Sequence, residues 1–238
     1  MHPYYNSHIK QYRKEISSLC SVIRPELETL FSLDADSVVR EIQDVFETKL
    51  LLDMPYVGGK KNSNDTSNLI SCCEFAAFFV VGKRYGIAEN EIGRLIHTAW
   101  QRKHKKVSPG ISRLRNRLLE KKFVHRFLKS FVAKSERYSK EYDYAWLFEY
   151  AEPNEEYSVI INCTRCGAYR YLKEIGLEYI IPYICNIDFE TAAAYGVPYY
   201  RNETIACGDV CCANLVKRNA PVIMDNYPPH CLRGDGLK

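Results

Sequence analysis

The chain has 238 residues, of which 46% are hydrophobic and 13% aromatic, and its formal net charge is +4. This composition excludes an intrinsically disordered chain, and the mild charge comes with no motif of a nucleic-acid-binding protein. No apolar run reaches the ~18 residues that a membrane span needs, and the first residues lack the apolar stretch of a secretory signal. We therefore expect a cytoplasmic protein that binds neither nucleic acid nor membrane. Its ten cysteines should then be thiols, metal ligands or catalytic groups rather than disulfides.

The first part of the chain, residues 1–140, is predicted to be a helical region. Apolar residues recur there at spacings of three and four, which is the pattern of amphipathic helices. A loop with paired glycines and polar residues, 55–68, separates the first two of these helices. The predicted helices span 37–54, 68–86, 88–106 and 111–140.

From about residue 143 the periodicity changes. Two runs of aromatic and β-branched residues, 143–150 and 156–163, flank the sequence AEPNE and predict an antiparallel hairpin. A short helix over 166–176 and a helix over 178–196 with a bend near Pro182 should follow.

Two more strands are predicted around a turn at GDVC, over 197–207 and 211–219. The fold class is therefore α+β, with an N-terminal helical half packed on a C-terminal antiparallel sheet with helices. We expect residues 1–140 and the cysteine-rich region 141–220 to form one integrated domain, and residues 221–238 to form a C-terminal tail.

Metal binding is the first chemistry that the clustered cysteines suggest. Cys163 and Cys166 lie three apart, Cys207 and Cys211 four apart, and four thiolates would satisfy a closed zinc site. The two pairs are not spaced as in a zinc ribbon, because a helical stretch with Cys185 lies between them. An iron–sulfur cluster is the alternative, but the compact cysteine run of ferredoxins is missing.

A reactive thiol is the second possibility. Cys166 begins a predicted helix after a strand, where the helix dipole favours a thiolate, and Arg165 beside it could bind a carboxylate. Cys185 and Asp188 lie three apart and would share one face of a helix. The alternative is that Cys185 is a buried core residue and Asp188 a helix cap.

The glycine-containing loop could bind a ligand. Gly58 and Gly59 allow a close approach of backbone to a small molecule, and Lys60 and Asn62 offer donors to a carboxylate. The alternative is a surface connector. In the following helix, Cys72 and Cys73 are interpreted as small core residues.

Three blocks of the sequence resemble the L-2-amino-thiazoline-4-carboxylic acid hydrolase family. The first is PYVGGKKN at 55–62, which precedes the apolar helix and KRYGIAENEIGRLI; the others are 162–190 and RNETIACGDVCC at 201–212. With the connecting helices, the resemblance covers residues 25–218. The family's pattern is a Thr-Arg-Cys before a helix, a Cys-x-x-Asp, and a Thr followed by Gly-x-x-x-Cys. In this chain it falls on Thr164, Arg165, Cys166, Cys185, Asp188, Thr204, Gly208 and Cys212.

Some residues depart from this pattern. Cys163, Cys207 and Cys211 have no counterpart in it. The family usually continues after its last cysteine with a charged and an aromatic residue, where this chain has Ala213 and Asn214. The departure leaves the exact substrate open.

The resemblance implies a hydrolase for a small carboxylated substrate. The reaction would cleave a cyclic amidine-like C–N bond, for example in 2-amino-thiazoline-4-carboxylate, which opens to N-carbamoyl-cysteine. It implies a catalytic cluster of Cys166, Cys185 and Asp188 with Cys212 near them. The substrate-binding residues would be Arg165, Gly58, Gly59, Lys60, Asn62 and Thr204.

Two other classes of function stay open on the sequence. One is a non-catalytic module that binds a small molecule or a metal, either zinc or an iron–sulfur cluster, through Cys166, Cys185 and Cys212. The other is an interaction protein with an exposed apolar patch. Whether a metal is required, whether the chain forms a homo-oligomer and what the C-terminal tail does are not determined by the sequence.

Overall fold

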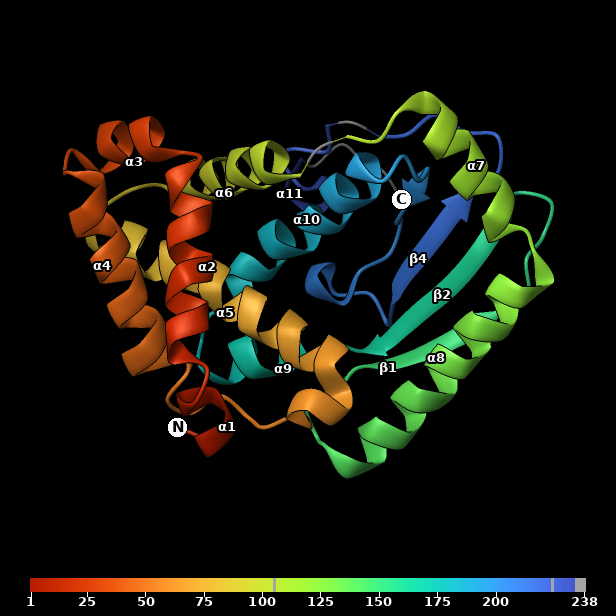
Figure 1. The fold of residues 1–238 in the computed structure, drawn as a ribbon, viewed down its shortest axis with the longest axis horizontal. Coiled ribbons are helices and arrows are strands. Elements are labelled where there is room, and N and C mark those ends of the chain that lie inside the picture. Colours follow the sequence, from red (N-terminus) through yellow and green to blue (C-terminus); the bar gives the residue numbers. More distant parts are fainter. Residues whose placement is uncertain (105, 224, 234–238) are drawn as a thin grey trace.

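The computed structural model describes residues 1–104, 106–223 and 225–233 (Figure 1). Helices make up the chain as far as Glu141, and a four-stranded antiparallel sheet with further helices follows, so the predicted α+β class is confirmed. The helices of the first part are α1 Pro3–Asn6, α2 Ile9–Ser21, α3 Arg24–Phe31, α4 Ala35–Val45, α5 Ser63–Arg84, α6 Glu89–Lys103, α7 Pro109–Leu119 and α8 Lys122–Glu141. A π-helical turn at Phe46–Leu50 and a 3-10 turn at Gly59–Asn62 complete this part.

Helix α4 illustrates how the sequence sets these elements. The Asp34 side chain accepts a hydrogen bond from the Ser37 backbone N–H and so caps the helix. Val38, Ile42 and Val45 follow at spacings of four and three and are all buried. The predicted helix over 37–54 thus begins two residues earlier than expected and ends in the π-helical turn.

The long helix predicted over 111–140 is wrong in one respect, because the structure divides it into α7 and α8. Lys121, between them, has an extended backbone. In α7, Ser112 and Asn116 donate hydrogen bonds to the carbonyl of Gly196, whereas α8 packs against the first strand. Helices α7 and α8 pack against different parts of the chain, and an unbroken amphipathic pattern does not reveal this difference.

The strands are β1 Leu147–Ala151, β2 Tyr157–Arg165, β3 Tyr199–Tyr200 and β4 Cys212–Lys217. They form one sheet in the order β1-β2-β4-β3, with every neighbouring pair antiparallel. The predicted hairpin is β1 and β2. The strand expected over 197–207 is much shorter, because Ile205–Cys207 forms a 3-10 turn instead.

The remaining helices are α9 Gly167–Glu174, a 3-10 turn at Glu178–Ile180, α10 Ile181–Ala194 and α11 His230–Arg233. The helix predicted over 178–196 with a bend near Pro182 is a 3-10 turn followed by α10, and Pro182 stands at the start of α10. It lies in the first turn, where its missing N–H removes no helical hydrogen bond.

Helix α5 lies at the centre of the molecule, between the α2–α4 group and the part that carries α9 and the sheet (Figure 1). The main cluster of buried apolar side chains runs from α2, α4 and α5 to Trp146 before β1 and Cys163 in β2. No helix among the described residues is both long and apolar enough to span a bilayer.

The expectation that the cysteines are thiols, metal ligands or catalytic groups rather than disulfides is wrong for one pair. Cys207, in the 3-10 turn, and Cys231, in α11, form a disulfide that ties the C-terminal segment to the turn before β4. The other eight cysteines are free thiols. The sequence did not reveal the pair because 24 residues separate the two cysteines.

Candidate active site

A cavity of about 560 Å³ lies between the sheet and the helices α5 and α10. Strand residues form one wall, where Phe148 and Cys163 lie opposite each other in β1 and β2, and Cys163 pairs in turn with Cys212 in β4. Cys212 and Asn214 face the same side because side chains alternate along a strand. Five cysteines line the cavity, and they are Cys72, Cys163, Cys166, Cys185 and Cys212.

Cys166 reaches the cavity as the residue that caps α9. Its Sγ accepts a hydrogen bond from the Tyr169 backbone N–H at 3.4 Å. Burial nevertheless raises the pKa of the Cys166 thiol to about 12, because desolvation outweighs the backbone donors. The expected lowering of this pKa by the helix N-terminus is therefore wrong, and Cys166 is a neutral thiol at neutral pH.

Cys185 and Asp188 lie on one face of α10, and both line the cavity. Burial raises the pKa of the Cys185 thiol well above its usual range. Asp188 lies inside the helix and not at its start, so the alternative that it serves as a helix cap is wrong. Its side chain is 57% exposed, and its carboxylate is thus open toward the cavity.

Arg201, just after β3, is the partner of Asp188. Its side chain is only 4% exposed, and its Nη2 donates both to Asp188 and, at 3.0 Å, to Asn214 Oδ1. Its Nη1 donates to the carbonyl of Cys185 at 3.2 Å. The Tyr199 hydroxyl donates to the same Asn214 oxygen at 2.6 Å. These bonds join α10, β3 and β4 into one polar network at the cavity wall.

The Nε of Arg201 is buried and has no hydrogen-bond partner among the described residues. Among the described residues that line the cavity, Arg201 is also the only cation and Asp188 the only acid. Arg201 has no predicted role from the sequence. The available signal was its place in the third block, RNETIACGDVCC, three residues before Thr204.

Thr204 supports the cavity from behind. It is 1% exposed, does not line the cavity, and its Oγ1 lies 3.3 Å from Cys212 Sγ in hydrogen-bond geometry. The Ile205 backbone N–H donates to the same sulfur at 3.4 Å. Gly208 makes the intervening turn possible, because its φ of 96° lies in the region that favours glycine.

The other residues with a predicted binding role lie elsewhere. Arg165 donates to two backbone carbonyls, those of Ala145 and Ser139, and does not line the cavity. The loop residues Gly58, Gly59, Lys60 and Asn62 are also outside the cavity lining.

The loop has its own packing. A side chain at Gly59 would collide with Tyr4 and Tyr56, and Asn62 donates to the buried Asp65. The role of Arg165 and of the loop residues Gly58, Gly59, Lys60 and Asn62 in substrate binding stays a prediction.

Cys72 and Cys73 differ in position although they are neighbours. Cys73 is fully buried in the core, as expected, whereas Cys72 is half-buried and lines the cavity. Cys72 packs against the core as interpreted, but it also faces the cavity, which the sequence of a helix that is apolar all round does not show.

The sulfur atoms of Cys166, Cys185 and Cys212 do not all lie within 4.8 Å of one another. Over the described part of the chain, the group that meets this distance is Cys207, His230 and Cys231, of which the two cysteines form the disulfide. A metal at the first three cysteines stays a prediction.

The model of the L-2-amino-thiazoline-4-carboxylic acid hydrolase family matches residues 71–214, which is more than half of the chain. The chain belongs to this family. Every residue that lines the cavity, except Asn68, lies within the matched segment. The glycine loop at 55–62 precedes this segment. Neither the curated proteins nor the solved structures gave a match to the chain.

Proposed function

We propose that the chain hydrolyses a 2-amino-thiazoline-4-carboxylate in the cavity between the sheet, α5 and α10. Family membership supports a hydrolase of this kind. The observation that carries the proposal is that Cys166, Cys185, Asp188 and Cys212 line one cavity. In its wall, the buried Arg201 forms an ion pair with the exposed Asp188.

The Arg201–Asp188 pair is complementary to such a substrate. A protonated aminothiazoline is an amidinium, whose adjacent N–H groups match the two oxygens of a carboxylate such as Asp188. The substrate's own carboxylate requires a cation, and Arg201 is the cation among the described residues that line the cavity. One ion pair can therefore bind both charged ends of the zwitterion.

We assign the nucleophile to Cys212. Its sulfur accepts a hydrogen bond from the Ile205 N–H and lies 3.3 Å from the Thr204 hydroxyl, which can rotate to donate to it. Cys166 and Cys185 are neutral thiols in a poorly hydrated wall. Their role in this scheme is to exclude water and to pack against the ring.

The reaction then proceeds in two balanced steps. The Cys212 sulfur bonds to the amidinium carbon between nitrogen and sulfur. The proton of the Cys212 thiol passes to the ring sulfur as the ring C–S bond breaks, and a covalent isothiouronium remains on Cys212. Water then adds to that carbon, the bond to Cys212 breaks with return of a proton, and N-carbamoyl-cysteine leaves.

This atom balance changes one expectation from the sequence. Opening the ring to N-carbamoyl-cysteine breaks a carbon–sulfur bond, whereas the carbon–nitrogen bond loses only its double-bond character. The cleaved bond in the proposal is therefore C–S and not C–N. A free thiol appears on the product.

The test is to incubate the purified protein with L-2-amino-thiazoline-4-carboxylate and to follow the appearance of the product thiol. We expect turnover by the wild type, a loss of at least about 100-fold in Cys212→Ser and Asp188→Asn, and a covalent adduct on Cys212 by mass spectrometry. Glu178→Gln, an exposed charge change just before α10, is the matched control and should keep full activity. Absence of turnover in the wild type would contradict the function, and full activity of Cys212→Ser would contradict the assigned nucleophile.

A further inference from the structure

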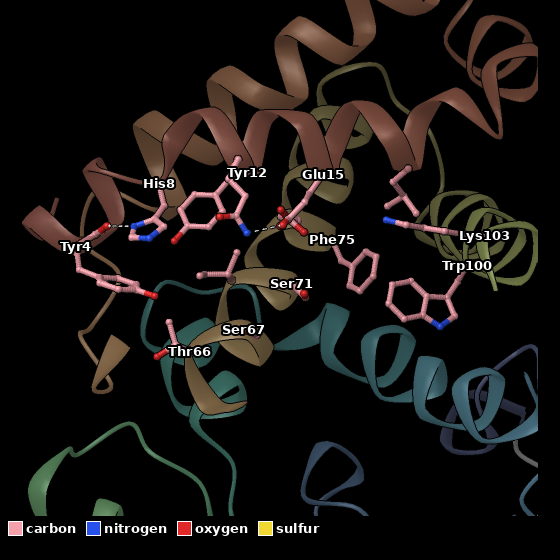
Figure 2. Close-up of a pocket in the computed structure, with 14 residues that line it drawn as sticks. Tyr4, His8, Tyr12, Glu15, Thr66, Ser67, Ser71, Phe75, Trp100 and Lys103 are labelled. Carbon is pink, nitrogen blue, oxygen red and sulfur yellow. Dashed lines mark hydrogen bonds between the residues drawn. The ribbon is translucent and has the colours of Figure 1, made fainter. Parts of the chain in front are cut away.

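A second cavity of about 410 Å³ lies between α2 and α5. Figure 2 shows side chains of α1 and α2 on one side of it, those of α5 on the other, and Trp100 and Lys103 of α6 at one end. Ser71, Phe75 and Trp100 line both this cavity and the candidate active site. The two cavities are therefore neighbours that share part of a wall.

The chemistry of the second cavity centres on Glu74. This residue is only 8% exposed, and its Oε1 is buried without a hydrogen-bond partner among the described residues. The half-buried Glu15 on α2 lines the same cavity and acts electrostatically on Glu74, and Gln11 donates to Glu15 at 2.9 Å. A buried acid with a free acceptor oxygen is costly unless a donor reaches it.

The electrostatics of the two carboxyl groups favour binding of a cation. Burial first, and Glu15 second, raise the pKa of Glu74 to about 8, while Lys103 opposes this shift. Lys103 itself is exposed and forms no ion pair within 4.0 Å with a described acid. The other titratable side chains at the cavity are His8, Tyr4 and Tyr12.

Aromatic rings surround the acids. Tyr4 and Tyr12 lie on the α1–α2 side, and Phe75 and Trp100 lie on the side of α5 and α6 (Figure 2). Aromatic faces attract organic cations and cover hydrocarbon, so they complement the charge of the carboxyl pair.

We propose that this cavity binds a primary organic ammonium ion, whose N–H groups bond to Glu74 and Glu15 and whose hydrocarbon part packs against the aromatic rings. The unpartnered oxygen requires a donor, which a primary ammonium has and a quaternary one does not. The possible ligand atoms of Glu15, Glu74 and His8 do not all lie within 4.8 Å of one another, so these described residues form no cluster for a metal ion.

This site is separate from the proposed hydrolase chemistry. Neither Glu74 nor Glu15 lines the candidate active site. The α1–α2 side of the cavity, from Tyr4 to Leu19, also precedes the segment that the family model matches.

The experiment measures binding of three probes by isothermal titration calorimetry to the full chain. Benzylamine carries a ring and a primary ammonium, benzyltrimethylammonium keeps the charge without N–H donors, and benzyl alcohol lacks the charge. We expect benzylamine to bind at least about 10-fold more tightly than either analogue, since each lacks one of the two required features. Because Glu74 loses its proton on binding, titrations in two buffers near pH 7 should also reveal proton release.

Variants locate the binding. Glu74→Gln, which keeps the shape, and Glu15→Gln as a second variant should each weaken benzylamine binding by at least about 10-fold. Asp188→Asn should leave it unchanged, which separates this site from the candidate active site. Lys103→Met should bind benzylamine at least as tightly as the wild type.

Three results would overturn the proposal. One is no detectable benzylamine binding to the wild type, and another is equal binding by Glu74→Gln and the wild type. The third is binding that appears only in Lys103→Met, which would mean that Lys103 already neutralises the acids.

Discussion

At the scale of single residues, Arg201 gives the candidate active site its polarity. Its guanidinium bonds to Asp188, Asn214 and the carbonyl of Cys185, so it fixes the carboxylate relative to the thiols. Lysine could not keep this arrangement, because it lacks the planar fork that donates in several directions at once. Both the charge and the geometry of this residue therefore matter at this position.

The neutral state of Cys166 makes a prediction about its reactivity. Alkylation requires the thiolate, and a pKa of about 12 leaves very little of it below pH 9. Iodoacetamide should label Cys166 at pH 8 at least about 100-fold more slowly in the native protein than in urea, and the ratio should shrink toward pH 11. Mass spectrometry of the labelled peptide measures this. Equal native and unfolded rates at pH 8 would show that the sulfur is not desolvated as the structure has it.

The buried Glu74 makes a prediction about stability and pH. Its pKa is higher in the folded protein, about 8, than the usual value of 4.5, so its contribution is fully stabilising below pH 4.5 and is lost as the pH rises through 8. Glu15, Tyr12, His8 and Lys103 around it are the same in the wild type and in Glu74→Gln, so the comparison isolates this one proton.

We therefore expect the two proteins to melt at similar temperatures at pH 5, and Glu74→Gln to melt several degrees higher at about pH 8.5. Differential scanning calorimetry across this range is the measurement. Glu178→Gln, with an exposed carboxylate, should show no such divergence from the wild type. A constant difference between Glu74→Gln and the wild type at every pH would mean that Glu74 titrates normally.

At the scale of elements, the start of α9 is tightly packed and leaves no room for a larger side chain at Gly167. Gly167 packs so closely on the Tyr144 carbonyl and the Trp146 ring that a Cβ atom would overlap both. The carbonyl belongs to the backbone and cannot rotate away. The next residue back along the chain is Cys166, so this contact also sets the position of its sulfur.

Gly167→Ala should therefore destabilise the protein by about 1–3 kcal/mol, the usual cost of overpacking, and lower its activity. Gly110→Ala in α7 is the matched control, since a Cβ there meets nothing within 4 Å, and it should change stability by less than about 1 kcal/mol. Urea denaturation of both variants measures the difference. Equal stabilities would indicate that α9 can move away from Tyr144.

The same scale shows what the sequence could predict. The hairpin, the helix after Cys166 and the shared face of Cys185 and Asp188 follow from local periodicity, and all are present. The division between α7 and α8 could not be predicted, because it depends on which distant segment each half contacts. A glycine loop such as 55–62 has the same sequence signature whether it binds a ligand or packs against tyrosines, as Gly59 does.

At the scale of the whole molecule, the candidate site is assembled from segments far apart in the chain. Helix α5 contributes Cys72, α10 contributes Asp188, and the sheet contributes Cys212. The sequence singled out three thiols and an acid, and the structure places them around one cavity. Arg201 and the disulfide between Cys207 and Cys231 stayed hidden because each depends on a pairing in three dimensions that no local pattern encodes.

The central claim is that the Arg201–Asp188 pair recognises a zwitterionic thiazoline. The most direct test is to compare kcat/KM for L-2-amino-thiazoline-4-carboxylate with that for 2-amino-thiazoline, which lacks the carboxylate, in the wild type and in Arg201→Met. We predict that the wild type prefers the carboxylated substrate by at least about 100-fold, and that Arg201→Met loses most of this preference. An undiminished preference in Arg201→Met would contradict the claim, as would a wild type that opens neither ring.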